Sequence, residues 1–169
     1  APEFISKFPS DLDGWIKTYD YDNDGDMDLF SYYNASIRCY RNDINSGAGL
    51  SFTLVVPQLY THYGTFPTNI YVSRVNMPAL SDVDNDGDMD VLAFSISGSW
   101  VEYHKNYAMD STGNPNGFLM YNIPQCWGYF ALKSTYNTAD LPPIPGCPLL
   151  PANPTIDNNQ SVEKKHAGS

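Results

Sequence analysis

Two nine-residue stretches, 20–28 and 82–90, constrain the fold more than anything else in this chain, because each carries an aspartate at every second position. They begin 62 residues apart and share seven consecutive identical residues. Each is followed by a β-branched and aromatic run, a turn, and a second such run, at 37–42 in one copy and 101–106 in the other. A chance duplication of a surface loop would not repeat the flanking strands. The copies therefore predict two like units, each with an acidic loop just before a hairpin.

The composition and the period of the repeat favour a β-propeller. Thirteen Tyr, eight Phe and three Trp, with 13 Pro and 12 Gly, describe a turn-rich β protein. A unit of about 60 residues with several short strands is typical of a propeller blade. Two repeats fall short of the four to eight blades of a closed propeller, so we expect part of a larger protein. The expected fold class is all-β, with β-propeller-type blades in a partial propeller.

The chain is expected to divide into three parts. Residues 1–57 form the first repeat with a lead-in, and residues 58–122 form the second repeat. Residues 123–169 are expected to form a Pro-rich irregular segment, or insertion, that leads towards a further repeat, because the prolines around 142–148 cannot form a regular ladder. Of the three cysteines, Cys126 and Cys147 are the favoured disulfide pair, while free thiols remain the alternative for Cys39, Cys126 and Cys147.

The spacing within each acidic stretch suits calcium, which takes six to eight oxygen ligands at about 2.3 to 2.6 Å. Carboxylates at positions 1, 3 and 5 point inward when the backbone curls, and a glycine at position 6 permits that turn. Position 7 is expected to offer its backbone carbonyl and position 9 its side chain. We predict two Ca²⁺ ions, one held by Asp20, Asp22, Asp24, Asp26 and Asp28, the other by Asp82, Asp84, Asp86, Asp88 and Asp90.

The acidic stretches fit an EF-hand, magnesium, zinc or ion-free turns less well than calcium. An EF-hand needs a bidentate glutamate at position 12 and flanking helices, whereas position 12 here is Ser31 or Ala93 in strand-like sequence. Magnesium prefers a tight octahedron with retained waters, and zinc would favour His or Cys ligands. Solvated turns without an ion would leave five carboxylates crowded within nine residues, in both copies.

At these residues the sequence resembles FG-GAP or VCBS repeats, whose blades in integrin-like β-propellers carry a calcium loop of the form Asp-x-Asp-x-Asp-Gly-x-x-Asp. Both stretches fit that form without departure. The wider pattern, over roughly residues 8 to 130, is similar to large secreted VCBS-repeat proteins of Bacteroidota. That resemblance implies export by type IX secretion and a secreted or cell-surface (extracellular) location.

No catalytic residue is predicted. His62, His104 and His166 stand alone, without partners at ligand or catalytic spacing. Aspartates committed to an ion are poor acids or bases, so the chain is not expected to be an enzyme. Some aromatic residues could form a glycan or peptide platform, although core packing is favoured for them: Trp15, Trp100, Trp127, Tyr32, Tyr33 and Tyr103.

The formal charge of −10 disfavours negatively charged partners. Ten of the 19 acidic residues lie in the two loops. Nucleic acid is disfavoured, and no apolar run of roughly 18 residues predicts membrane insertion. The expected function is a non-catalytic, calcium-binding structural or adhesive region, with a protein or carbohydrate ligand at the cell surface, or the secretion machinery, as partner. The alternative is an accessory propeller region of a secreted hydrolase or lyase, with catalytic residues outside this chain.

Overall fold

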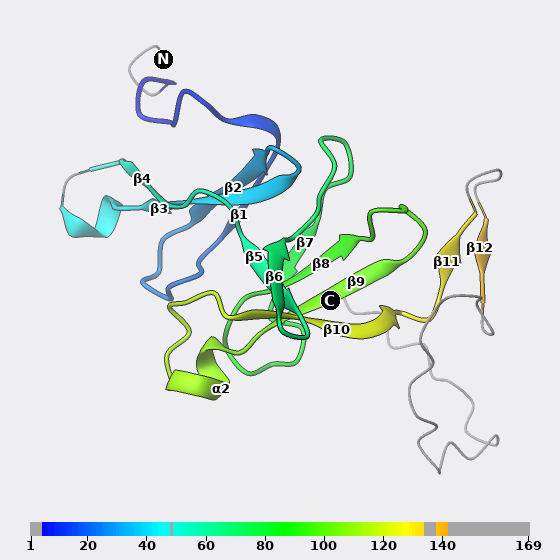
Figure 1. Cartoon of the computed structure of the whole chain (residues 1–169). Coiled ribbons are helices and arrows are strands. Elements are labelled where there is room, and N and C mark those ends of the chain that lie inside the picture. Colours follow the sequence, from blue (N-terminus) through cyan, green and yellow to red (C-terminus); the bar gives the residue numbers. More distant parts are fainter. Residues whose placement is uncertain (1–4, 48, 134–137, 142–169) are drawn as a thin grey trace, which may run out of the picture.

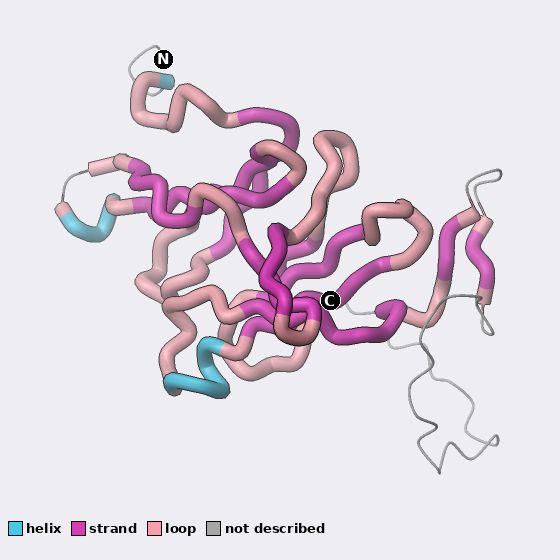
Figure 2. The backbone as a smooth tube through the Cα atoms, in the orientation of Figure 1, coloured by secondary structure: helices cyan, strands magenta, loops and turns pink. Residues whose placement is uncertain are grey.

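A computed structural model of the chain describes residues 5–47, 49–133 and 138–141. Its described residues are almost entirely strands and loops, as Figure 2 shows, which confirms the all-β prediction. The strands are β1 (Asp13–Tyr19), β2 (Asp28–Tyr33), β3 (Ser36–Asn42), β4 (Phe52–Val56), β5 (Tyr60–Tyr63), β6 (Phe66–Asn69), β7 (Ala79–Ser81), β8 (Asp90–Phe94), β9 (Val101–Asn106), β10 (Met120–Trp127), β11 (Ala131–Leu132) and β12 (Ala139–Asp140). A 3₁₀ helix, η1 (Ile44–Ser46), and a short helix, α2 (Ala108–Thr112), follow β3 and β9.

The first sheet is a four-stranded antiparallel meander in the order β1-β2-β3-β4. Each strand pairs with its neighbour in sequence, so short turns are enough to connect the strands. The β2–β3 turn places Asn34 and Ala35 at positive φ (49° and 57°). This sheet contains all the described strands of the first predicted repeat, since β4 ends before residue 57.

The second sheet has six strands in the order β6-β5-β10-β9-β8-β7. Its strands β7 to β10 repeat the antiparallel meander of the first sheet. The hairpin β5–β6 precedes them in sequence but joins the far edge, where β5 pairs in parallel with β10 (Met120 with Thr61, Tyr121 with His62). Figure 1 shows the two sheets side by side, with this hairpin beside β10.

The strand β10 extends further than the sequence indicated. An irregular segment was expected from residue 123, but β10 continues to Trp127, with a register shift between Ile123 and Cys126. Pro124 lies within that shift, where a strand tolerates a residue that donates no backbone hydrogen bond. The small β11–β12 hairpin follows. The rest of the Pro-rich segment, residues 142–169, lies outside the described residues.

The main core lies between the two sheets. It is formed by buried side chains of both sheets and of the loops beside them, namely Trp15, Tyr21, Phe30, Ile37, Cys39, Leu59, Ile70, Val72, Met89, Val91, Ala93 and Met120. The Trp15 indole N–H donates to the Ser73 carbonyl oxygen at 3.1 Å, so its polar edge is satisfied. Burial of this kind is the main stabilisation of such a fold, since each fully buried large apolar side chain contributes roughly 1.5 to 3 kcal/mol.

The predictions for aromatic residues and cysteines have mixed outcomes. Trp15 and Tyr103 are buried as expected for packing, whereas Tyr33 and Trp127 are exposed by 44% and 37%. Cys39 is a buried free thiol. Cys126 is disulfide-bonded, and Cys147, its predicted partner, lies outside the described residues. Within the described part of the chain, no helix has the length and apolar character to cross a membrane.

Candidate metal centres

Each acidic loop connects the first two strands of its meander. Loop 1, residues 20–28, runs from β1 into β2, and loop 2, residues 82–90, runs from β7 into β8. The two loops also touch, because the Asn23 amide N–H donates to the Gly87 carbonyl oxygen at 3.4 Å. The repeated sequence thus occupies equivalent places in two neighbouring sheets.

Both loops curl in the same way because their residues at positions 4 and 6 adopt positive φ. Asn23 and Gly25 have φ of 55° and 90°, and Asn85 and Gly87 have φ of 63° and 98°. Asparagine and glycine are the residues that adopt this conformation at least cost. The shared Asn-Asp-Gly sequence therefore explains why the two backbones bend alike.

The first aspartate of each loop holds this curl. Asp20 accepts the backbone N–H groups of Asp24 (3.1 Å) and Gly25 (3.0 Å), one on each carboxylate oxygen. Asp82 repeats both contacts, at 3.1 and 3.0 Å, with Asp86 and Gly87. A carboxylate offers about four lone-pair sites, so each of these aspartates keeps acceptor capacity for a cation.

The last aspartate of loop 1 is a buried anchor. Asp28 is fully buried, and it accepts the backbone N–H of Tyr21 at 3.0 Å and that of Asn42, on β3, at 2.8 Å. Burial raises the pKa of Asp28 to about 6, although the two backbone N–H groups favour its charged form. The loop is thereby tied to the second hairpin strand.

The last aspartate of loop 2 repeats this anchor. Asp90 is fully buried and accepts the backbone N–H groups of Val83 (2.9 Å) and Asn106 (2.7 Å), while the Tyr103 hydroxyl donates to it at 3.1 Å. Asn42 and Asn106 were noted in the sequence only as ends of the repeated strands. Their clamping role depends on a backbone N–H, which no side-chain pattern reveals.

The carboxylates at positions 1, 3 and 5 of each loop converge. The two groups are Asp20, Asp22 and Asp24, and Asp82, Asp84 and Asp86, with one oxygen of each residue within 4.8 Å of the others. Two oxygens at 2.3 to 2.6 Å from one calcium ion are at most about 5 Å apart, so this spacing fits the ion. The other predicted ligands, Asp26, Asp28, Asp88 and Asp90, lie outside these groups of three.

Several carboxylate oxygens in the loops are buried without a hydrogen-bond donor. Among the described residues these include Asp22 Oδ1, both oxygens of Asp26, and Asp88 Oδ1. Burial, followed by the neighbouring carboxylates, raises the pKa of Asp22 and of Asp26. A buried acceptor without a donor costs free energy, which a bound cation would remove. The donor set is entirely oxygen, and it suits a hard divalent cation better than zinc.

The surroundings of the loops differ. In loop 2, Lys105 Nζ contacts Asp84 and lies 3.1 Å from Asp86 and 3.0 Å from Asp110. In loop 1 the equivalent basic residue, Arg41, is paired with Asp43 at 2.8 Å. The Met109 N–H donates to Asp88 Oδ2 at 2.9 Å, so the start of α2 also binds loop 2.

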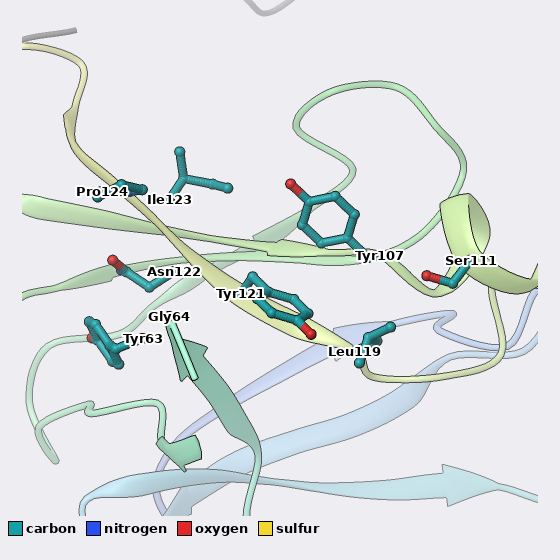
Figure 3. Close-up of a pocket in the computed structure, with 9 residues that line it drawn as sticks. All are labelled: Tyr63, Gly64, Tyr107, Ser111, Leu119, Tyr121, Asn122, Ile123 and Pro124. Atoms are coloured by element: carbon teal, nitrogen blue, oxygen red, sulfur yellow. The ribbon is translucent and has the colours of Figure 1, made fainter. Parts of the chain in front are cut away.

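A second candidate site is a cavity of about 700 Å³ beside β10. Figure 3 shows Tyr63, Tyr107 and Tyr121 on its wall with Asn122 and Ser111, and the remaining lining is mostly aliphatic. The ring of Tyr121 is held by stacking on His62 (centroids 4.8 Å apart) and by an edge contact with Tyr107 (5.4 Å). The sequence did not predict this site, since its tyrosines come from three separate segments of the chain.

Comparison with known proteins supports the repeat assignment for part of the chain. Searches among curated proteins and among solved structures find no match. The model of the FG-GAP-like repeat family matches residues 20–93, from the first residue of loop 1 into β8. That range contains both acidic loops and the strands between them, so this part of the chain is similar to FG-GAP-like repeats.

Proposed function

We propose that this chain is a calcium-binding repeat region of β-propeller type in a secreted or cell-surface protein, with a structural or adhesive role and no catalytic step of its own. The observation that carries the proposal is the convergence of three carboxylates in each of two loops that bend alike. Calcium would neutralise the clustered charge and satisfy the buried oxygens, since it binds carboxylates without needing helices around the site.

The role of the ion follows from where the loops lie. Each loop connects two strands of a sheet, and its last aspartate is fixed to the next strand, so an ion bound there would stiffen the start of the meander. A ligand that binds only the folded chain stabilises it by about 2.7 kcal/mol when present at a hundredfold excess over its Kd. We therefore propose that calcium stabilises the folded chain.

Calorimetric titration of the calcium-free chain with CaCl₂ tests the proposal. We expect two bound ions per chain, competition by magnesium only at much higher concentration, and a higher melting temperature with calcium than with excess chelator. A folded chain that binds no calcium, or equal melting temperatures in the two conditions, would refute the metal sites.

The tyrosine-lined cavity favours carbohydrate as the ligand for an adhesive role. Tyrosine rings pack against the C–H faces of sugars, and the amide of Asn122 and the hydroxyl of Ser111 can bind sugar hydroxyls. A glycan array followed by titration of the best hit would test this. Tyr121→Ala should abolish binding, whereas Tyr60→Ala, at an exposed residue of the neighbouring strand β5 and outside the cavity lining, should not. If both variants still bind the glycan, the cavity is not the binding site.

The alternative of an accessory region in a secreted hydrolase or lyase makes a different prediction. Full-length protein would then cleave a polysaccharide, and removal of residues 1–169 would lower its action on insoluble substrate more than its action on short soluble substrate. If the full-length protein cleaves no polysaccharide, the structural or adhesive role is favoured.

A further inference from the structure

The two loops share a scaffold but receive different basic side chains. Arg41 and Lys105 occupy equivalent places, each one residue before the asparagine whose N–H clamps the last aspartate. The Arg41 side chain is 42% exposed, and its Nε binds Asp43, outside loop 1. The Lys105 side chain is only 15% exposed, and its ammonium lies among the carboxylates of loop 2.

The carboxylates that hold Lys105 include two of the three that converge in loop 2. Asp84 and Asp86 are at positions 3 and 5, and both contact the ammonium nitrogen. An oxygen that accepts an ammonium hydrogen is not free for an ion on the same side, and two cations held by one carboxylate repel each other. An ion that enters loop 2 must therefore displace Lys105 from these oxygens.

Loop 1 has no such competitor within the described part of the chain. Among the residues that the structure describes, no basic side chain forms an ion pair with an aspartate of loop 1. Arg41 is retained by Asp43, which also accepts the Thr53 hydroxyl at 2.5 Å. The seven identical residues of the two loops thus have different charged neighbours.

We propose that Lys105 is an internal competitor for calcium that makes loop 2 the weaker of the two sites. The inference rests on the proposed function, because it concerns the relative strength of the same two sites. Asp110, which lies 3.0 Å from Lys105 Nζ outside the loop, gives the lysine a partner to keep when the ion enters. At low calcium, Lys105 then neutralises part of the negative charge of loop 2, and the loop binds its ion only at higher calcium.

Calorimetric titration of the whole chain with CaCl₂ measures this difference. We expect two dissociation constants at least about tenfold apart, which corresponds to about 1.4 kcal/mol. Asp24→Ala should remove the tighter site and Asp86→Ala the weaker one. Two equal constants in the unmodified chain would overturn the inference, whereas a folded chain that binds no calcium would refute the proposed function itself.

Lys105→Met identifies the cause, since methionine keeps an unbranched apolar stem and removes the charge. The weaker constant should tighten by at least about fivefold, a change of roughly 1 kcal/mol. Arg41→Met, the matched control in loop 1, should leave that constant unchanged. A weak site that stays weak in Lys105→Met would overturn the inference. Lys105→Gln, with melting curves in chelator, gives a second variant in case the methionine disturbs folding.

Discussion

The two acidic loops are alike in backbone and unlike in charge. In both, the first aspartate curls the chain and the last one is clamped by the backbone N–H of an asparagine on the next strand. In loop 1, the basic side chain of that strand points to a partner elsewhere. In loop 2, it lies among the carboxylates.

This difference teaches that the residues of an acidic loop are only one part of a candidate ion site. The motif residues fix the fold of the loop, because they carry the turn conformations and the hydrogen bonds. The charge that an incoming ion meets is set by a residue on the following strand, which family motifs do not include. The surroundings of identical loop residues also differ in burial, since Met27 is 58% exposed and Met89 is 1% exposed.

The largest expected effect tests what the loops share. Asp28→Asn and Asp90→Asn each replace one accepting oxygen with an NH₂ group that faces a buried N–H. Without calcium at pH 7.5, each should lower the free energy of unfolding by roughly 2 to 4 kcal/mol, measured by urea denaturation. Asp13→Asn, at a partly exposed residue of β1 whose carboxylate pairs with Arg74 at the surface, should change it by less than about 1 kcal/mol. A loss of stability in only one of the two variants would contradict the common scaffold.

Acidification should weaken calcium binding in both loops. Burial raises the pKa of Asp28 and of Asp88 to about 6 in the calcium-free chain. Because these values lie above the unfolded ones, the two groups stabilise the calcium-free fold at low pH, and this contribution is lost as pH rises through about 6. Calcium needs the ionised forms, so its stabilisation has the opposite dependence and decreases as pH falls.

The measurement for this pH effect is the difference in melting temperature with and without calcium, at pH 7.5, 6 and 5. One pH unit below the raised pKa should cost about 1.4 kcal/mol per site. The buried His104, whose pKa is lowered by burial to about 4, affects both curves and cancels in the difference. A constant difference down to pH 5 would contradict the role of the buried aspartates.

A smaller effect separates the loops. At a fixed, limiting calcium concentration, Asp24→Ala should lower the melting temperature more than Asp86→Ala, because it removes the tighter site. A tenfold difference in Kd corresponds to about 1.4 kcal/mol of stabilisation, or roughly 3 to 6 °C for a chain of this size. Thermal melts with dialysed protein measure it. The reverse order would assign the tighter site to loop 2.

The smallest effect concerns the resting partner of Lys105. Asp110→Asn removes the carboxylate outside the loop, so Lys105 should stay more firmly on Asp84 and Asp86 and weaken calcium binding in loop 2 by about two- to threefold, or roughly 0.5 kcal/mol. Asp140→Asn is the matched control, since Asp140 is equally exposed and pairs with Lys133. Calorimetry should detect the change only in the first variant.

Much of the fold could be predicted from the sequence. The alternation of β-branched and aromatic residues after each loop located β2, β3, β8 and β9, and the glycine at position 6 located the curl. The convergence of positions 1, 3 and 5 follows from the same local geometry. These features depend on neighbours in sequence, which is why a pattern reveals them.

What the sequence did not reveal depends on distant contacts. The partner of β5 is β10, about 60 residues away, and no local signal distinguishes that pairing from a continued meander. The cavity beside β10 arises only when β5, α2 and β10 meet. Likewise, Arg41 and Lys105 look interchangeable in sequence, but Arg41 pairs with Asp43, whereas Lys105 lies among Asp84, Asp86 and Asp110.

The parallel pairing of β5 with β10 has a consequence for the order of folding. All strands of the first sheet lie within residues 13–56, so this sheet can assemble as soon as that segment leaves a ribosome. The β5–β6 hairpin can join its sheet only after β10 has been made, because β10 is the strand with which β5 pairs. A swap of repeats that cuts within residues 70–78 would separate the hairpin from its sheet, whereas a cut between β4 and β5 would keep each sheet whole.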